Sequence, residues 1–131
     1  MVPFGILVKS FREDASAAER LFGSIRRFNS EHLPVWVVVP DVDVEMFTDI
    51  VHGIGEVIPE SAFEDQLVSE PVAGVRPGYI NQEIIKLAFW EMGLAGNYLP
   101  VDSDAVFLRP FGISDFMHSD DVPYTVLLED R

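Results

Sequence analysis

The sequence predicts an α/β domain with a mostly parallel sheet between helices. Its strongest strand signal is 35–39, five consecutive apolar residues between Pro34 and Pro40. A strand that is apolar on both faces is typical of a parallel sheet covered by helices on both sides. Short apolar runs alternate with segments of helical periodicity in the order β-α-β-α-β-α-β, which indicates the same class. The 131 residues fit one domain, assigned to 1–131.

Three segments have the apolar periodicity of helices. Residues 16–28 begin with Ser16 and, three positions later, Glu19, which together match a capping box. Residues 44–51 predict a short second helix, and 79–92 a longer third one. The predicted apolar stripe of the third helix consists of Ile80, Ile84, Leu87 and Ala88, widened by Ile85, Phe89 and Met92.

The remaining strands are predicted from short β-forming runs between turn residues. They cover 4–8, 56–58, 98–101, 105–108 and 124–128. The segment 61–78 is acidic with scattered Pro and Gly, and we interpret it as a loop. Loops of this length inside a compact domain tend to be functional or poorly ordered.

The composition argues against several classes of function. The formal net charge is −13, from 22 acidic and 9 basic residues, so we expect no nucleic-acid partner, because phosphate binding needs a Lys/Arg surface. The absence of cysteine excludes disulfides, thiolate metal sites and cysteine nucleophiles. No apolar run reaches transmembrane length and no leader is recognisable at the N-terminus, so a cytoplasmic protein is expected.

A pair of carboxylates, Asp102 and Asp104, interrupts an apolar stretch at the end of a predicted strand. Charges there are costly unless a cation or hydrogen-bond donors compensate them. A divalent metal holding a diphosphate would do so, since Mg²⁺ and Mn²⁺ take one or two carboxylates plus phosphate oxygens. The plain alternative is a turn in which the Asp side chains bond their own backbone. The position favours the metal, because open α/β sheets bind ligands at the carboxyl ends of strands.

A second Asp-x-Asp motif, Asp41-Val42-Asp43, also follows a buried strand. For this motif the structural interpretation is favoured, because Asp41 or Asp43 is well placed as the N-cap of helix 44–51. Contact with the base or ribose of a nucleotide is the alternative. The spacing alone therefore does not predict a site.

Four further residues are candidates for ligand binding. Gln82 and Lys86 lie one helical turn apart on the helix that leads to the carboxylate pair, with Lys86 as a point charge for phosphate. Lys9 and Ser10 end the first strand, where they could reach a bound nucleotide. The alternatives are a solvated helix face and a polar turn. Three histidines lie in predicted loops without metal-binding spacing: His32, His52 and His118.

Taken together, these segments resemble bacterial glycosyltransferases of the GT-A type, which have a Rossmann-like, mostly parallel sheet with flanking helices. The resemblance is carried by the first strand with Lys9-Ser10, by 24–28 before 35–40, by 78–87 and by 98–108. The last two segments are similar to the helix and Asp-x-Asp unit of glycogenin and the lipopolysaccharide galactosyltransferases. A closer resemblance is to a little-characterised bacterial group with a Gln-x-x-x-Lys helix before its Asp-x-Asp.

The resemblance implies a GT-A nucleotide-sugar-binding subdomain that uses Mn²⁺ or Mg²⁺ and a UDP- or GDP-linked sugar donor. The metal ligands would be Asp104, as the firmest, and Asp102. The substrate-binding residues would be Lys9, Ser10, Gln82, Lys86 and Asp102. The implied chemistry is displacement at the anomeric carbon, with the metal acting as a Lewis acid on the departing diphosphate. The acceptor, glycan or other, is not specified.

The resemblance stops short at the C-terminal end. GT-A domains of this kind continue well past the Asp-x-Asp, and that part supplies acceptor binding and often a third metal ligand, commonly a His. Here the sequence reaches Arg131 with one predicted strand, 124–128, beyond the two apolar runs that flank the pair. The sequence therefore predicts the donor-binding half of such an enzyme, either as a truncated product or completed by homo-oligomerisation or a second chain.

Two other functions remain as alternatives. Haloacid-dehalogenase-like phosphotransferases also place Asp-x-Asp after an apolar strand, with the first Asp as nucleophile, here Asp102. They carry the motif on their first strand, whereas several elements precede it here. The other alternative is a metal- or donor-binding fragment without turnover.

Overall fold

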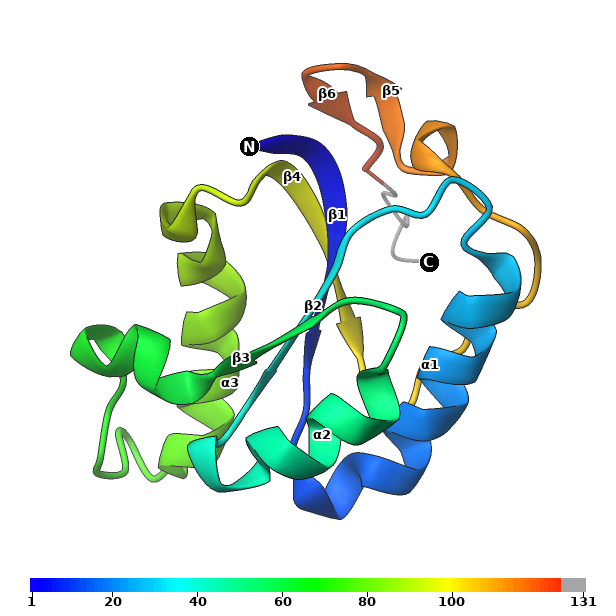
Figure 1. Cartoon of the computed structure of the whole chain (residues 1–131). Helices are drawn as coiled ribbons and strands as arrows, with labels where there is room; N and C mark the ends of the chain where they lie inside the picture. The colour runs from blue at the N-terminus through cyan, green and yellow to red at the C-terminus, as the bar shows by residue number, and fades with distance from the viewer. Residues whose placement is uncertain (126–131) are drawn as a thin grey trace, which may run out of the picture.

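A parallel sheet of four strands forms the centre of the protein in the computed structural model, which describes residues 1–125 (Figure 1). The strands lie in the order β3-β2-β1-β4, and each neighbouring pair is parallel. Their bounds are Val2–Lys9 for β1, Val35–Val39 for β2, Glu56–Pro59 for β3 and Ala95–Asp102 for β4. The predicted α/β class is confirmed.

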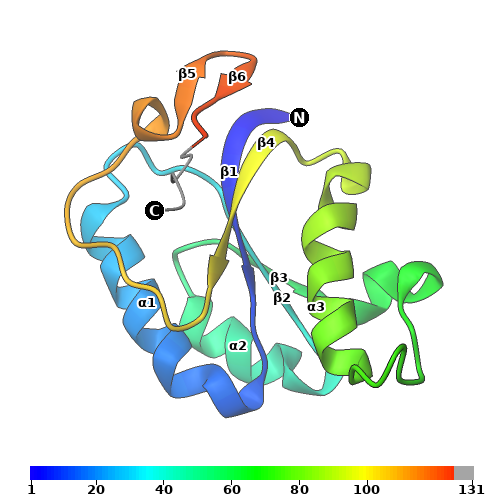
Figure 2. The same cartoon turned by 180° about the vertical axis from the view of Figure 1, so that it is seen from behind.

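Helices cover both faces of this sheet, as the apolar strands predict. Helices α1 (Ala15–Phe28) and α2 (Val44–Val51) lie on one face and α3 (Pro77–Ala88) on the other (Figures 1 and 2). Short 3₁₀ turns connect the elements, at Arg12–Asp14 (η1), Asp41–Asp43 (η2), Glu60–Gln66 (η3), Phe89–Met92 (η4) and Ile113–Asp115 (η5). A small antiparallel hairpin follows, β5 (Met117–Ser119) and β6 (Val122–Pro123).

Alternate residues of the central strands build two separate hydrophobic cores. Ile6 and Val8 of β1 pack with α1 and α2, whereas Leu7 between them packs with α3. All three side chains are 0% exposed. A strand buried on both faces has no polar position available until it ends. Polar chemistry can therefore appear only at the edges of this sheet.

The strand order reverses between β1 and β4. From β1 the chain moves outward through β2 to β3, and it then returns through α3 to place β4 on the other side of β1. Open α/β sheets bind ligands at the carboxyl ends of the strands flanking such a reversal. In Figure 1 the carboxyl ends of β1 and β2 and the start of α3 lie at the bottom of the view. This Rossmann-like topology therefore selects one edge of the molecule for a site.

Gly5 leaves room for the ring of Trp36 against β1. A Cβ at this position would lie 2.3 Å from Cζ3 of Trp36 and 2.9 Å from the carbonyl oxygen of Pro34. The ring of Trp36 in turn packs on Phe89, with the ring centroids 5.3 Å apart. A side chain at position 5 would therefore displace the Trp36 ring from the core beneath α3.

Two predicted helix caps are wrong. Helix α1 begins at Ala15, and the exposed side chain of Ser16 does not cap it. Helix α2 follows Asp43, which also makes no side-chain cap. In both cases a 3₁₀ turn, η1 or η2, leads directly into the helix. The backbone hydrogen bonds of this turn continue those of the helix, as in the bond from Asp14 N–H to the Phe11 carbonyl oxygen. The helical hydrogen bonding therefore begins before the predicted cap residue.

The predicted apolar stripe of α3 is partly wrong. Leu87 is 74% exposed, whereas Ile85 and Phe89 are almost completely buried. The buried face is displaced toward Phe89, whose ring packs against the rings of Trp36 and Tyr98. The helix also ends earlier than predicted, at Ala88, and continues as η4. Gly93 then reverses the chain with a φ of 68°.

The predicted strand 105–108 is not formed. The segment instead runs along the outside of α1 (Figure 2), where the Ser24 hydroxyl accepts a hydrogen bond from Phe107 N–H. Stacked aromatic rings fix it, with the Phe107 and Phe111 centroids 4.0 Å apart. The predicted strand 124–128 is absent at residues 124 and 125, and 126–128 lie outside the described residues. Hairpin β5–β6 was not predicted.

Candidate functional site

Two buried hydroxyl groups connect the carboxyl ends of β1 and β4 through hydrogen bonds. Lys9 and Asp102 are register partners in the parallel pair. Immediately beyond them, the Ser103 hydroxyl donates to the Lys9 carbonyl oxygen over 3.2 Å and lies 2.8 Å from the Ser10 hydroxyl. Ser10 is 1% exposed and Ser103 6%. Ser10 is therefore buried beneath the site and does not form part of its surface.

The residues after β4 form a tight turn that presents both carboxylates to solvent. Ala105 N–H donates to the Asp102 carbonyl oxygen over 3.1 Å, which closes the turn through the backbone. Asp102 is 64% exposed and Asp104 is also exposed. Within residues 1–125 the Asp104 carboxylate accepts no hydrogen bond and forms no ion pair. The turn is therefore present, but it does not use the Asp side chains.

Lys86 extends from α3 to this turn. Its Nζ lies 3.0 Å from Asp102 Oδ1 and 3.4 Å from Glu83 Oε1, and the side chain is only 17% exposed. Burial acts to lower the pKa of Lys86, but the hydrogen bond and charge of Asp102, with the charge of Glu83, outweigh it and raise that pKa. Gln82 and Lys86 line the same hollow as the Asp pair, and a ligand role for them stays a prediction.

Two hollows share a wall and form one cleft along the carboxyl edge of the sheet. The smaller, of about 320 Å³, contains both carboxylates and Lys86. The larger, of about 630 Å³, lies over the ends of β1 and β2 and contains Lys9. Both are lined by Asp14, Tyr79 and Gln82. The cleft thus brings together five of the six predicted site residues, with Ser10 beneath it.

Lys9 forms a buried ion pair at the floor of the larger hollow. Its side chain is 8% exposed, and its Nζ lies 2.7 Å from Glu60 Oε1 and donates to the Ser10 carbonyl oxygen over 2.8 Å. Glu60 is three-quarters buried. Removal of either partner would leave the other group buried without its partner, which is costly.

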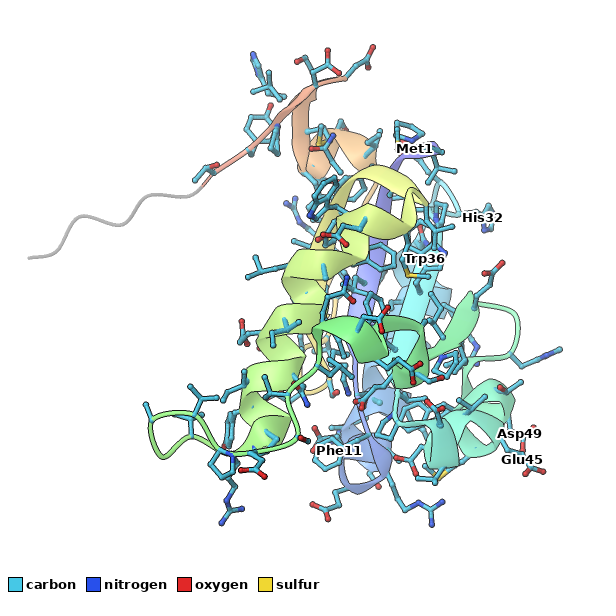
Figure 3. All side chains as sticks on the ribbon, turned by 90° about the vertical axis from the view of Figure 1, so that its left-hand side faces the viewer. Met1, Phe11, His32, Trp36, Glu45 and Asp49 are labelled. Carbon is cyan, nitrogen blue, oxygen red and sulfur yellow. The ribbon has the colours of Figure 1, made fainter. Side chains whose placement is uncertain are left out.

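Several cleft residues were missed by the sequence reasoning, including Phe11, Glu60, Arg76 and Tyr79. Glu60 could have been found, because it directly follows the third strand, and parallel strands end at one edge. Phe11 lies at that edge in Figure 3, whereas Met1, His32 and Trp36 lie toward the opposite one. Phe11 and Tyr79 are both exposed.

The first Asp-x-Asp motif is used differently. Asp43 is buried, and its two carboxylate oxygens accept Arg12 N–H at 2.9 Å and Arg12 Nε–H at 3.1 Å. Asp41 accepts Ser61 N–H at 3.0 Å, which lowers the pKa of Asp41. The motif therefore ties together three loops at the same edge of the sheet.

The Asp102 and Asp104 pair fits a metal ion that is shared with a ligand. Among the described side chains, no three His, Asp or Glu residues lie close enough to hold a metal by themselves. Mg²⁺ commonly binds through one or two carboxylates and completes its shell with phosphate oxygens and water. The histidines are not near this pair, and His118 instead packs on the ring of Tyr124.

The comparisons with known proteins bear on the family and leave the activity open. No curated protein and no solved structure matches the chain. Over residues 1–125, no helix is both long enough and apolar enough to cross a membrane. A family of unknown function, DUF6492, matches residues 2–127, and the chain belongs to this family.

Proposed function

We propose that the protein binds a nucleoside-diphosphate sugar together with Mn²⁺ or Mg²⁺ and acts as a glycosyltransferase of the GT-A type. One observation carries the proposal. The cleft at the β1/β4 reversal contains two exposed carboxylates: Asp104, which has no protein partner among residues 1–125, and Asp102, which contacts a lysine on α3. That combination provides for both a divalent cation and the phosphates that the cation would accompany.

In this proposal Asp104 and Asp102 hold the metal, which supplies Lewis-acid chemistry at the departing diphosphate when it is bound. Lys86 lies within reach of the same phosphates, because its Nζ already contacts Asp102. Its ion pairs keep it protonated, so it offers a full positive charge to the leaving group. Tyr98 positions the end of α3 by donating its hydroxyl hydrogen to the Lys86 carbonyl oxygen.

The larger hollow would take the nucleoside. It adjoins the carboxylate pair through the shared wall and has exposed aromatic rings from Phe11 and Tyr79 beside buried polar groups. Aromatic side chains stack readily on nucleobases. The start of α3, from Pro77, lies at the same hollow, and the partial positive charge of a helix N-terminus favours an anionic ligand.

Calorimetry with UDP and GDP, with and without Mn²⁺, tests the donor site. We expect binding of at least one nucleotide only in the presence of the metal, and its loss in Asp104→Ala. The matched control is Asp49→Ala, an exposed carboxylate on α2 outside the cleft, which should bind as the wild type does. Equal nucleotide affinity in Asp104→Ala and the wild type would refute the donor site.

Transfer is tested separately from binding. A slow release of sugar from UDP- or GDP-sugars, dependent on Mn²⁺ and lost in Asp104→Ala, is expected of a transferase that lacks its acceptor. Binding without any release in every oligomeric state would instead indicate a donor-binding protein. Trapping of a phosphoaspartate at Asp102 would favour the phosphotransferase alternative, in which Asp102 is the nucleophile.

A further inference from the structure

The buried ion pair of Lys9 and Glu60 can form further hydrogen bonds with a ligand. The Lys9 ammonium has three N–H donors, and two are used by Glu60 Oε1 and the Ser10 carbonyl oxygen. One N–H donor therefore remains. Glu60 can accept several hydrogen bonds, and among the described residues only Lys9 contacts its carboxylate. The floor of the larger hollow thus presents one cationic donor beside a carboxylate with free lone pairs.

A planar ring could reach this floor between aromatic side chains. Phe11 is 39% exposed and Tyr79 is 71% exposed, and both line the 630 Å³ hollow with Lys9 and Glu60. Exposed rings beside a buried ion pair are typical of a ligand pocket, in which apolar walls bind a ring and a few polar groups fix its orientation. A nucleobase matches this combination.

The polar groups discriminate between bases. The edge of guanine offers an acceptor, O6, followed by two donors, N1–H and the N2 amino group. Lys9 can donate to O6 while the Glu60 carboxylate accepts from both donors, a bidentate and charge-assisted arrangement. Uracil offers an acceptor, a donor and then a second acceptor, O2, which would face the carboxylate and be repelled. Adenine and hypoxanthine each match fewer groups, because neither has the adjacent pair of donors.

We propose that this hollow selects guanine through Lys9 and Glu60, so that the sugar donor is GDP-linked. The proposal rests on the donor site proposed above and adds the identity of the base. A site built to hydrogen-bond a group rejects analogues that lack it, because its own buried polar groups are then left unpaired.

The test measures the affinities of GDP, inosine diphosphate and UDP by calorimetry at saturating Mn²⁺. For the wild type we expect GDP to bind about tenfold tighter than inosine diphosphate, which lacks only the N2 amino group, and tighter still than UDP. This ligand series needs no mutation, so it does not depend on whether a variant folds.

The Glu60→Gln variant is expected to shift the nucleotide preference from GDP toward UDP. The glutamine amide offers one acceptor and one donor, which suits N3–H and O2 of uracil, so UDP should bind more tightly and GDP about tenfold less tightly than to the wild type. Glu45→Gln is the control, since Glu45 is an exposed carboxylate on α2 that lines neither hollow. Thermal unfolding of each variant verifies that it is folded.

The outcomes separate the two proposals. Equal affinities for the three nucleotides, or a preference for UDP in the wild type, would overturn the assignment of guanine and leave the donor site intact. No binding of any nucleotide at any metal concentration would overturn the donor site itself, and the assignment of guanine with it.

Discussion

The two Asp-x-Asp motifs have the same spacing, follow parallel strands of one sheet and lie at the same end of it, yet the protein uses them in different ways. Asp43 is 4% exposed and binds both a backbone N–H and the guanidinium of Arg12. Asp102 is 64% exposed, and Asp104 accepts no hydrogen bond among residues 1–125. Both carboxylates of the first motif are bound within the fold, whereas in the second motif Asp102 contacts only Lys86 among the described side chains and Asp104 is open to a ligand.

The difference arises from the strands that the motifs follow. β2 lies inside the sheet, between β1 and β3, so the loop after it meets two neighbouring loops, and its carboxylates satisfy their backbone and side-chain donors. β4 is the outermost strand on the other side of β1, so fewer hydrogen-bond donors of the protein surround its carboxyl end. Position in the sheet, rather than spacing in the sequence, decides whether a carboxylate is free for a ligand.

The largest effect is expected at the second motif. Asp104→Ala should weaken Mn²⁺-dependent nucleotide binding at least 100-fold, a change of about 2.7 kcal/mol or more, because it removes a metal ligand. The free energy of unfolding should change by less than about 0.5 kcal/mol, since the side chain is exposed and makes no contact to lose. Calorimetry and urea denaturation measure the two quantities, and a marked loss of stability would show that this carboxylate belongs to the fold.

The first motif should show the reverse pattern. Asp43→Ala should lower the free energy of unfolding by about 2 kcal/mol, because two hydrogen bonds are lost and the Arg12 backbone N–H loses its acceptor. Asp43→Asn can retain part of this bonding and should lose less. Urea denaturation of both variants is the measurement. A stable Asp43→Ala protein with impaired nucleotide binding would instead place this motif in the ligand site.

Lys86→Met should have opposite effects on two ligands. Lys86 occupies Asp102 at 3.0 Å, so its charge competes with a metal for that carboxylate. Without it, Mn²⁺ alone should bind more tightly, by about threefold to tenfold, whereas the nucleotide diphosphate in the presence of Mn²⁺ should bind more weakly by a similar factor.

Electron paramagnetic resonance of free Mn²⁺ measures the first effect of Lys86→Met, and calorimetry with the nucleotide measures the second. Glu83→Gln is the control, because it removes the other carboxylate near Lys86 and leaves the contact with Asp102 in place. A fall in both affinities would show that Lys86 only positions Asp102.

The sequence predicts the sheet well because its two central strands, β1 and β2, are buried on both faces. Val35–Val39 can only be a central strand, and its fully buried side chains confirm this. The order of strands and helices then places Lys9 and Asp102 together, since parallel strands end at one edge. That inference needs only the connectivity of the chain.

Other features depend on contacts between segments distant in the sequence. Residues 105–108 have β-forming side chains, but the Ser24 hydroxyl on α1 and the ring of Phe111 hold this segment outside the sheet. Glu60 was missed because its role depends on Lys9, 51 positions earlier. Local propensity contains no information about such partners.

The smallest effect concerns the pH dependence conferred by Asp41. The backbone N–H of Ser61 favours the ionised carboxylate and lowers the pKa of Asp41 below the ordinary value of 3.8. This contribution to stability is complete above that ordinary pKa and is lost as the pH falls through the lower, folded-state value. Asp41→Asn retains an oxygen acceptor but cannot titrate, so its stability should decline less steeply below about pH 4. Thermal unfolding from neutral to acidic pH measures the two slopes, with Asp49→Asn as the control at an exposed position on α2. Identical slopes for Asp41→Asn and the wild type would show that the charge of Asp41 does not stabilise its contact with Ser61. The contrast with the second motif would then rest on Asp43 alone.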